Sequence, residues 1–430
     1  MIISTLCLAS ILSNILAFNF TVICMAGEKP SNGSNSTGSN NYREDLDYSS
    51  VEKTVLFVSV GIGALFAVFP MTLILNKFGS RVTEVMLTLS GLLFLIPCSS
   101  SAIYVCSTIT ASGVGFSACL PVMGSITSHW STLKQNGIFI AILSSFLQIA
   151  PMFTMPVAGE LCTSSLGWES VYYLHGIVTI ALFTVFIVYH RNAPTKHPLV
   201  KPKELMKVMF GKGSIYSGPG KQRVSKKVPY AAMYKDPAIW AILVAAFGNF
   251  MGTQLSLQFM PTYINKVLFL SIAQTGLATA VASIIMFFIK LLAGQTSDKI
   301  KQIVLVASTC ILGFNSGGFF KSSQMVSRQH SHFTLANIAF VNCTCMLLTP
   351  LLSELIAPDN TPETWSIVLC LHGVILLTTN AFFCVFGSAR PASWTFVSWS
   401  RKGSHVKPIQ PNRQKIYDLT PDRPKIDAKL

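Results

Sequence analysis

The sequence predicts an all-α, polytopic membrane protein, and its composition is the first observation that does so. Of the 430 residues, 51% are hydrophobic and only 11% are charged, whereas soluble domains contain about 25% charged residues. So little charge cannot cover a soluble surface, and one soluble core cannot bury so much apolar sequence. Eleven separate apolar runs are the second observation, because a membrane-spanning helix needs about 20 apolar residues.

The apolar runs fall into a group of six and a group of five. The first group lies near 3–25, 53–76, 82–98, 101–127, 137–160 and 169–190, and the second near 238–262, 271–296, 303–320, 332–355 and 365–388. We therefore expect four parts. They are an N-terminal six-helix bundle (1–190), a basic cytoplasmic linker (191–236), a C-terminal bundle of five spans (237–388) and a basic disordered tail (389–430).

Charge in the loops predicts the orientation of the chain. The loop 26–52 is acidic and holds two glycosylation sequons, at Asn32 and Asn35, so we place it outside or in a lumen. Basic residues follow the second and fourth runs, and the linker 191–236 contains eleven Lys and Arg. By the positive-inside rule, the N-terminus and the linker are cytoplasmic. The net charge of +15 then reflects inner loops, and we expect no nucleic-acid partner.

The charge pattern changes phase after the eighth run. Lys299 falls on the inner side, but the next run begins at Ile303 with no span between them. Counting onward places Lys321, Arg328 and the basic tail outside, against the positive-inside rule. One missing span after Ile300 would restore every later loop to its expected side. The alternative is that long loops and tails follow the rule poorly, and we favour the missing span.

The N-terminal run and the cysteines have two readings each. Residues 1–25 could be a secretory signal, but they lack a basic leader and contain Asn14 and Asn19, so we expect a retained first span. The eleven cysteines could form bridges. Because most lie inside apolar runs, we expect them to be reduced, small and buried.

Two loops carry related motifs at symmetric places. Asn76-Lys77-Phe78-Gly79-Ser80-Arg81 follows the second run, and Gly294-Gln295-Thr296-Ser297-Asp298-Lys299 follows the eighth. Both resemble the G-x-x-x-D-R/K-x-G loop of the major facilitator superfamily. The resemblance implies two pseudo-symmetric helical bundles, with 11 apparent spans arranged as 6 + 5, and a solute site between them. It also assigns a conformational role to the motif residues Lys77, Gly79, Arg81, Gly294, Asp298 and Lys299.

Further segments resemble one branch of that superfamily, the anion:cation symporters that include sialin, sodium/phosphate cotransporters and vesicular glutamate transporters. The matching segments are Asn19–Met25, Gly167–Gly176 and Gly313–Gly318, in the family's order. The resemblance implies secondary transport of small organic anions or related solutes by alternating access. In that family a further span precedes the last of these segments, at the place where the charge pattern changes phase.

The family's charged residues are absent at the matched positions. Its first-span Arg is Ala17 here, and its fourth-span Arg, Glu and His are Ile109, Phe116 and Gly124. Coupling to Na⁺ or H⁺ is possible but unsupported at these positions, and we expect no other cofactor. A neutral, polar cavity would be lined by Asn19, Thr21, Gln148, Asn249 and Gln254. Each of these side chains could equally make an interhelical hydrogen bond.

Two functional hypotheses remain open. The first is a secondary transporter. The second is a non-transporting or incomplete relative that acts as a membrane receptor or partner-binding protein. We find no catalytic constellation and no metal-ligand spacing, so an enzyme is not expected. We expect a monomer in the lipid bilayer of the plasma membrane or of a vesicle or lysosome. Lys290 is the one deep basic residue, and it could snorkel to the inner surface.

Overall fold

The computed structural model describes residues 1–25, 50–79, 102–132, 136–198, 200–209, 230–299, 312–327, 330–388 and 390–395. All regular secondary structure in these ranges is helical, which confirms the all-α prediction. Seven of the described helices are long and apolar enough to cross a membrane. The predicted glycosylation sites Asn32 and Asn35, the motif residue Arg81 and the tail beyond 395 lie outside the described residues.

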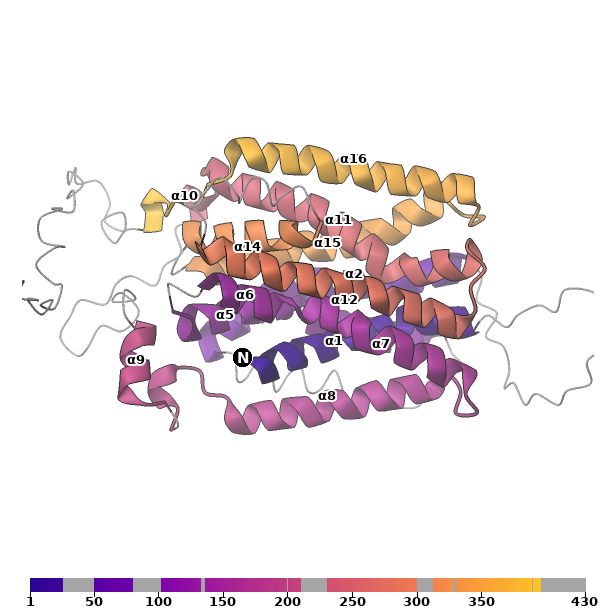
Figure 1. Ribbon diagram of the computed structural model, residues 1–430, viewed down its shortest axis with the longest axis horizontal. Coiled ribbons are helices and arrows are strands. Elements are labelled where there is room, and N and C mark those ends of the chain that lie inside the picture. The colour runs from indigo at the N-terminus through magenta and orange to yellow at the C-terminus, as the bar shows by residue number, and fades with distance from the viewer. Residues whose placement is uncertain are drawn as a thin grey trace, which may run out of the picture.

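The N-terminal half contains α1 (Ile2–Met25), α2 (Ser50–Phe78), α4 (Ala102–Ser117), α5 (Cys119–Trp130), α6 (Asn136–Ser144), α7 (Phe146–Thr163) and α8 (Glu169–Tyr189) (Figure 1). Two runs that we expected to be continuous helices are interrupted. Ala118 separates α4 from α5, because Pro121 cannot donate a backbone hydrogen bond to Ser117. Ser145 separates α6 from α7, and its Oγ donates to Ile142 O at 2.6 Å.

The linker contains a 3₁₀ turn (Pro194–Lys196), α9 (Pro202–Met209) and α10 (Tyr230–Tyr234). The C-terminal half contains α11 (Pro237–Lys266), α12 (Ile272–Lys299), α14 (Leu312–Ser327), α15 (Ser331–Ile356) and α16 (Pro362–Phe386), followed by a 3₁₀ turn (Ser393–Thr395). N-cap residues in the sequence determine where two of these helices begin. Asp236 caps α11 by accepting from Ala238 N at 3.0 Å, and Thr361 caps α16. Each cap precedes a proline.

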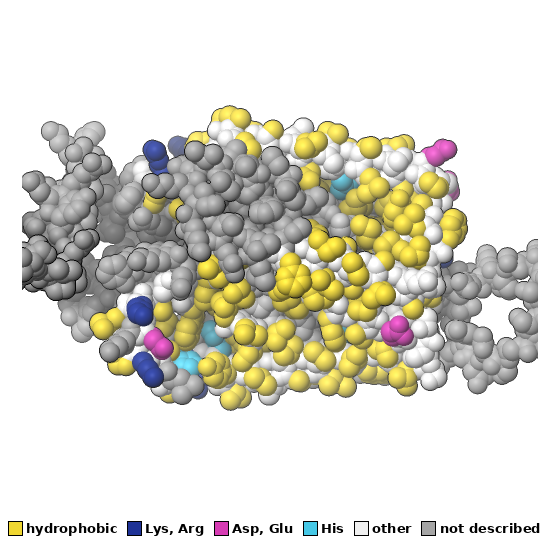
Figure 2. Space-filling model, in the orientation of Figure 1, with side chains coloured by type: hydrophobic (Ala, Val, Ile, Leu, Met, Phe, Trp, Pro, Cys, Tyr) yellow, Lys and Arg dark blue, Asp and Glu magenta, His cyan; other side chains and the backbone are white. Residues whose placement is uncertain are grey.

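The two ends of the helical bundle differ in charge. Exposed Lys and Arg gather near α9 and α10, together with Glu204 of α9, whereas the other Asp and Glu visible in Figure 2 lie toward the opposite end (Figures 1 and 2). We call the end with α9 and α10 the inner end and the opposite one the outer end, as the positive-inside rule suggests. At the inner end, Asn192 Nδ2 donates to Phe78 O at 3.4 Å and so joins the start of the linker to the end of α2.

Helices α12 and α14 are consecutive among the described helices and run in the same direction. The end of α14 lies at the inner end, because Ala392 N donates to Val326 O at 3.1 Å and Trp394 Nε1 donates to Asp236 Oδ2 at 3.0 Å. The direct count that placed Lys321 outside is therefore wrong. The inner position is the one that a missing span predicts. Residues 300–311, where that span would fall, lie outside the described residues.

We predict that the chain after α16 lies on the same side of the membrane as the linker. A peptide tag after Leu430 and a tag in the linker near 215 should both be protected in sealed cells and both be stained after permeabilisation. The physical reason is the contact between Trp394 and Asp236, which holds the residues after α16 against the start of α11. Staining of the C-terminal tag alone in intact cells would contradict the fold of the last third.

One pair of cysteines contradicts the expectation that all are reduced. Cys24, at the outer end of α1, and Cys162, at the outer end of α7, form a disulfide. The expectation holds for buried thiols deeper in the bundle, such as Cys119 and Cys343. The two cases differ in position, because Cys24 and Cys162 meet at the outer ends of their helices while Cys119 and Cys343 are buried within the bundle.

Candidate functional site

The outer end of the molecule contains a pocket between its two halves, with a volume of about 370 Å³. Helices α1 and α2 supply one wall, and α11, α15 and the turn before α16 supply the other. The lining residues are Val22, Ile23, Lys53, Thr54, Phe57, Phe259, Thr262, Lys266, Ser353, Glu354, Ala357, Asp359, Asn360 and Trp365. A pocket shared by both halves is the place where a rearrangement of the halves would change access to a solute.

Charge in this pocket is balanced. Lys53 and Lys266 contribute two cations, and Glu354 and Asp359 contribute two anions. These four residues cannot be singled out from the sequence, because charged residues at the ends of apolar runs resemble ordinary loop residues. Only the fold shows that these four charged residues, each at the end of a different apolar run or in the turn beside it, lie in one pocket. The pocket can therefore accept a solute that carries both signs of charge.

Aromatic rings form the deeper part of the same pocket. Phe259 of α11 lies with its ring centroid 5.3 Å from that of Phe57 in α2 and 6.1 Å from that of Trp365 in α16. Trp365 Nε1 donates to Asn360 Oδ1 at 3.1 Å, which fixes the indole. Ser353 Oγ is buried and has no hydrogen-bond partner. The Ser353 hydroxyl is therefore available to a solute in the pocket.

Two unpartnered amide atoms lie beneath the pocket. Asn19 is one helical turn inward of Ile23, and Gln258 is one turn inward of Thr262. Both side chains are buried, at 2% exposed. Asn19 Nδ2 and Gln258 Oε1 have no hydrogen-bond partner, although α1 and α11 pack together. Buried polar groups are normally satisfied, so this unused donor and acceptor mark a place for a polar ligand or water.

The five predicted cavity residues are all buried, and none of them lines the outer pocket. Thr21 Oγ1 lies 2.7 Å from Tyr172 Oη in α8, within the N-terminal half. Gln254 Nε2 donates to Asn342 Oδ1 of α15 at 2.9 Å, within the C-terminal half. Thr21 and Gln254 therefore make interhelical hydrogen bonds, which the sequence analysis gave as the alternative to lining a cavity. Gln148 and Asn249 are 9% and 3% exposed.

Apolar packing fills two positions where the resembling family has titratable groups. Phe116 is 3% exposed. A Cβ on Gly124 would lie 2.5 Å from Leu335 Cδ1, so α5 and α15 of opposite halves touch there without room for a side chain. Neither position therefore offers this chain a titratable side chain.

The structure describes the first loop motif as far as Gly79. That residue has a φ of +84°, which favours glycine, and a Cβ there would collide with Asn192. Lys77 is exposed, with its Nζ 5.2 Å from the centroid of the Phe78 ring. In the second motif, Gly294, Asp298 and Lys299 belong to the last turns of α12, and their side chains lie outside the described part of the chain.

Comparison with known proteins decides the family. The sequence profile of the Major Facilitator Superfamily matches residues 3–341. The chain belongs to the Major Facilitator Superfamily. A bacterial proton:xylose symporter of this superfamily has a similar fold, with a TM-score of 0.60 at 13% identity over 92% of this chain and 98% of that one. A bacterial homologue of the human lysosomal transporter Spinster, in an inward-facing and occupied conformation, gives a TM-score of 0.56 at 14% identity.

Curated relatives of this Major Facilitator chain confirm the branch that the sequence resembles. Sialin of Ovis aries is 24% identical over 322 residues, which cover 66% of this chain and 63% of sialin. Sodium-dependent phosphate transport protein 1 of Mus musculus is 26% identical over 275 residues, which cover 61% of this chain and 55% of that protein. The chain therefore matches somewhat under two thirds of these relatives. It is a multi-pass integral membrane protein with the fold of transporters and not of enzymes.

Proposed function

We propose that this chain is a secondary transporter that moves small organic anions or related solutes by alternating access of its two halves. The outer pocket carries the proposal, because α1 and α2 of one half and α11 and α15 of the other line it together. Two lysines and two acids favour a zwitterion, or an anion that carries a hydrogen-bonding group, over a simple anion. The unused amide atoms of Asn19 and Gln258 would bind the solute one turn deeper.

We propose that the coupling ion of this transporter is Na⁺ or H⁺. Neither is supported at the positions where the family has its acid and its histidine, since Phe116 and Gly124 occupy them. Coupling would therefore involve other groups, and Glu354 and Asp359 are the carboxylates that line the outer pocket. We expect a monomer to suffice, because both halves of the pocket come from one chain.

Uptake by the purified full-length chain in proteoliposomes tests the proposal. The panel should contain labelled zwitterionic amino acids, small carboxylates and inorganic phosphate, each with an imposed Na⁺ gradient, a pH gradient or neither. We expect uptake of at least one organic solute above protein-free vesicles, with inhibition by an excess of the unlabelled solute. Uniform failure across the panel, with protein that is monodisperse and correctly inserted, would refute transport.

A membrane receptor or partner-binding relative is the second candidate. The observation that favours it is the loss of charge at the family's matched positions, together with the parallel course of α12 and α14. This hypothesis predicts saturable solute binding to detergent-purified protein without any flux. Equilibrium binding measured beside uptake therefore separates the two candidates.

We predict opposite effects for two polar residues of the central helices. Asn19→Leu should weaken solute binding by about tenfold, because one net hydrogen bond of about 1–1.5 kcal/mol is lost. It should leave thermal stability unchanged or higher, since Asn19 Nδ2 has no partner to lose. Gln254→Leu should instead destabilise the protein by about 1–3 kcal/mol, because Asn342 Oδ1 and Gln258 Nε2 both lose a partner.

The two readouts are half-saturation of uptake and the midpoint of thermal denaturation in detergent. Gln254→Leu serves as the matched control for Asn19→Leu, since both remove a buried amide from a helix that lies between the halves. Unchanged half-saturation in Asn19→Leu would remove Asn19 from the solute site.

A further inference from the structure

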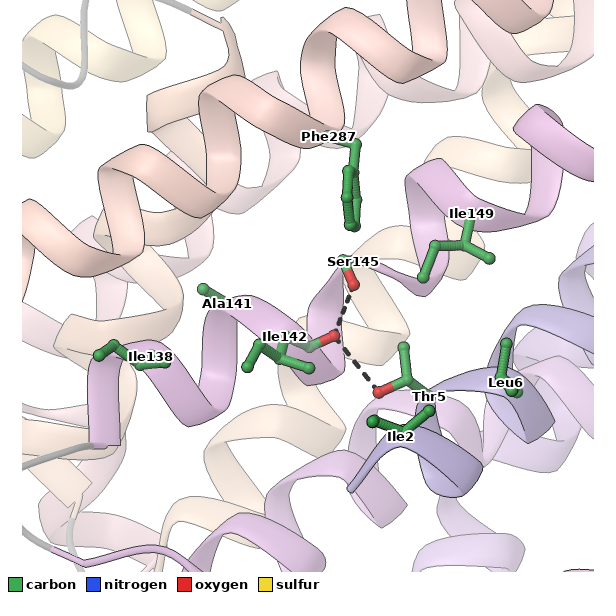
Figure 3. Close-up of a pocket in the computed structure, with 9 residues that line it drawn as sticks. All are labelled: Ile2, Thr5, Leu6, Ile138, Ala141, Ile142, Ser145, Ile149 and Phe287. Atoms are coloured by element: carbon green, nitrogen blue, oxygen red, sulfur yellow. Dashed lines mark hydrogen bonds between the residues drawn. The ribbon is translucent and has the colours of Figure 1, made fainter.

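A second pocket, of about 320 Å³, lies where α6 ends and α7 begins (Figure 3). Its walls come from α1, from both helices of this junction and from Phe287 of α12, which points into the space between them. The volume is at the lower end of the range of about 300–1,000 Å³ found for small-molecule sites. The pocket is separate from the outer one and shares no lining residue with it.

Hydrocarbon dominates the lining of this junction pocket. Its only two hydroxyl side chains are Thr5 and Ser145. Ser145 Oγ donates to Ile142 O at 2.6 Å, and Thr5 Oγ1 lies 3.4 Å from the same carbonyl (Figure 3). Both hydroxyl protons are thus directed to backbone oxygen. A polar solute would lose its hydration here without compensation, so the pocket suits a hydrocarbon ligand.

The rim of the junction pocket carries exposed apolar side chains of a membrane-spanning helix, as expected for a surface that faces lipid. Ile2 and Leu6 of α1 line it and are 71% and 37% exposed. The other end of α1 contributes Val22 and Ile23 to the outer pocket, so Ile2 and Leu6 lie toward the inner end of this span. At that depth the surrounding solvent is the acyl region of the inner leaflet. The molecule available to fill the pocket is therefore a lipid chain.

The inner end of the protein also has the charge that attracts acidic lipids. Lys77, Lys201 and Lys235 are exposed there, and Figure 2 shows basic side chains gathered at this end. Basic residues near a membrane surface are attracted to anionic headgroups. The positive charge of this end thus complements an acidic headgroup, while the pocket itself complements its hydrocarbon tail.

We propose that the junction pocket binds an acyl chain of an anionic phospholipid from the inner leaflet. The acyl chain of the lipid inserts between α1, the junction of α6 and α7, and α12. It thereby contacts both halves of the protein. A lipid in this place would stabilise the arrangement of the halves in which the pocket exists. This proposal does not depend on which solute is transported, or on transport itself.

Photo-crosslinking in membranes tests whether the junction pocket binds a lipid acyl chain. The full chain is reconstituted in phosphatidylcholine vesicles with a trace of phosphatidylglycerol that carries a diazirine on its acyl chain, and labelled peptides are mapped by mass spectrometry. We expect labelling of the peptide around Ala141 and Ile149. Ala141→Phe fills the pocket and should reduce this labelling by about tenfold, as expected for the lost burial of about two methylene groups. Ala181→Phe, on the exposed face of α8, is the matched control and should leave it unchanged.

A second variant covers the case in which Ala141→Phe fails to fold. Leu6→Trp changes a partly exposed rim residue and should also reduce labelling, with normal elution from size-exclusion chromatography. Equal labelling in Leu6→Trp and Ala181→Phe would overturn the pocket as the lipid site. Equal labelling by a phosphatidylcholine probe of the same chain would overturn the preference for an anionic headgroup.

Discussion

Replacing Gly276 with alanine is expected to reduce solute uptake by about tenfold or more. Gly276 lies where α12 packs against α7, at the outer ends of the two halves. An added Cβ would collide with Met155 O and would lie 3.3 Å from Pro156 Cα. These are backbone atoms, so the strain is relieved only if the helices separate. Overpacking of this kind costs about 1–3 kcal/mol, and 1.4 kcal/mol is a factor of ten in population.

Two measurements check this expectation. The first is uptake of the transported solute in proteoliposomes. The second is the rate at which a membrane-impermeant maleimide labels Ser353→Cys in the outer pocket, which should rise when Gly276→Ala holds the outer ends apart. Gly373→Ala on α16 is the matched control, because a Cβ at Gly373 meets nothing within 4 Å. If both alanine variants transport and label alike, the contact between α7 and α12 does not control outer closure.

Hydropathy predicts the positions of most spans, because a membrane helix ends where polar loops begin. The expected run 3–25 is α1 (Ile2–Met25), and the run 169–190 is α8 (Glu169–Tyr189). Hydropathy does not predict the breaks at Ala118 and Ser145. Neither break changes the apolar character of the run, and each depends on the local hydrogen bonding of one residue.

The candidate site was less predictable than the fold. Asn19 and Thr21 are polar positions two residues apart on one helix, and sequence alone treats them alike. In the fold Thr21 faces Tyr172 of α8, whereas Asn19 lies on the side of α1 that continues to Ile23 and the outer pocket. The lysines and acids of that pocket were missed because their meeting depends on the arrangement of four helix ends. Helical spacing identifies a face, but only the neighbouring helices decide what that face contacts.

Loss of the disulfide between Cys24 and Cys162 is expected to lower the apparent melting temperature by about 5–15 °C. The bond joins α1 to α7 across a sequence separation of 138 residues. Bridges that close long loops stabilise by about 2–4 kcal/mol, chiefly by restricting the unfolded chain. In a helical half of this size, 1 kcal/mol corresponds to about 2–4 °C. The measurement is thermal denaturation of detergent-purified protein followed by size-exclusion chromatography.

The single variants Cys24→Ser and Cys162→Ser and their double variant should all melt at the same lower temperature, because each removes one shared bond. A reductant should bring the parent down to that temperature and leave the variants unchanged. Cys370→Ser, on the exposed face of α16, should melt like the parent. Additive losses in the double variant would mean that the two thiols act separately.

The disulfide also bears on the side of the membrane that the outer pocket faces. Because disulfide formation requires an oxidising compartment, an intact bond in protein taken from cells would place the outer pocket, which lies at the same ends of the helices, outside the cytosol. The solute would then enter or leave the pocket from the extracellular or luminal side.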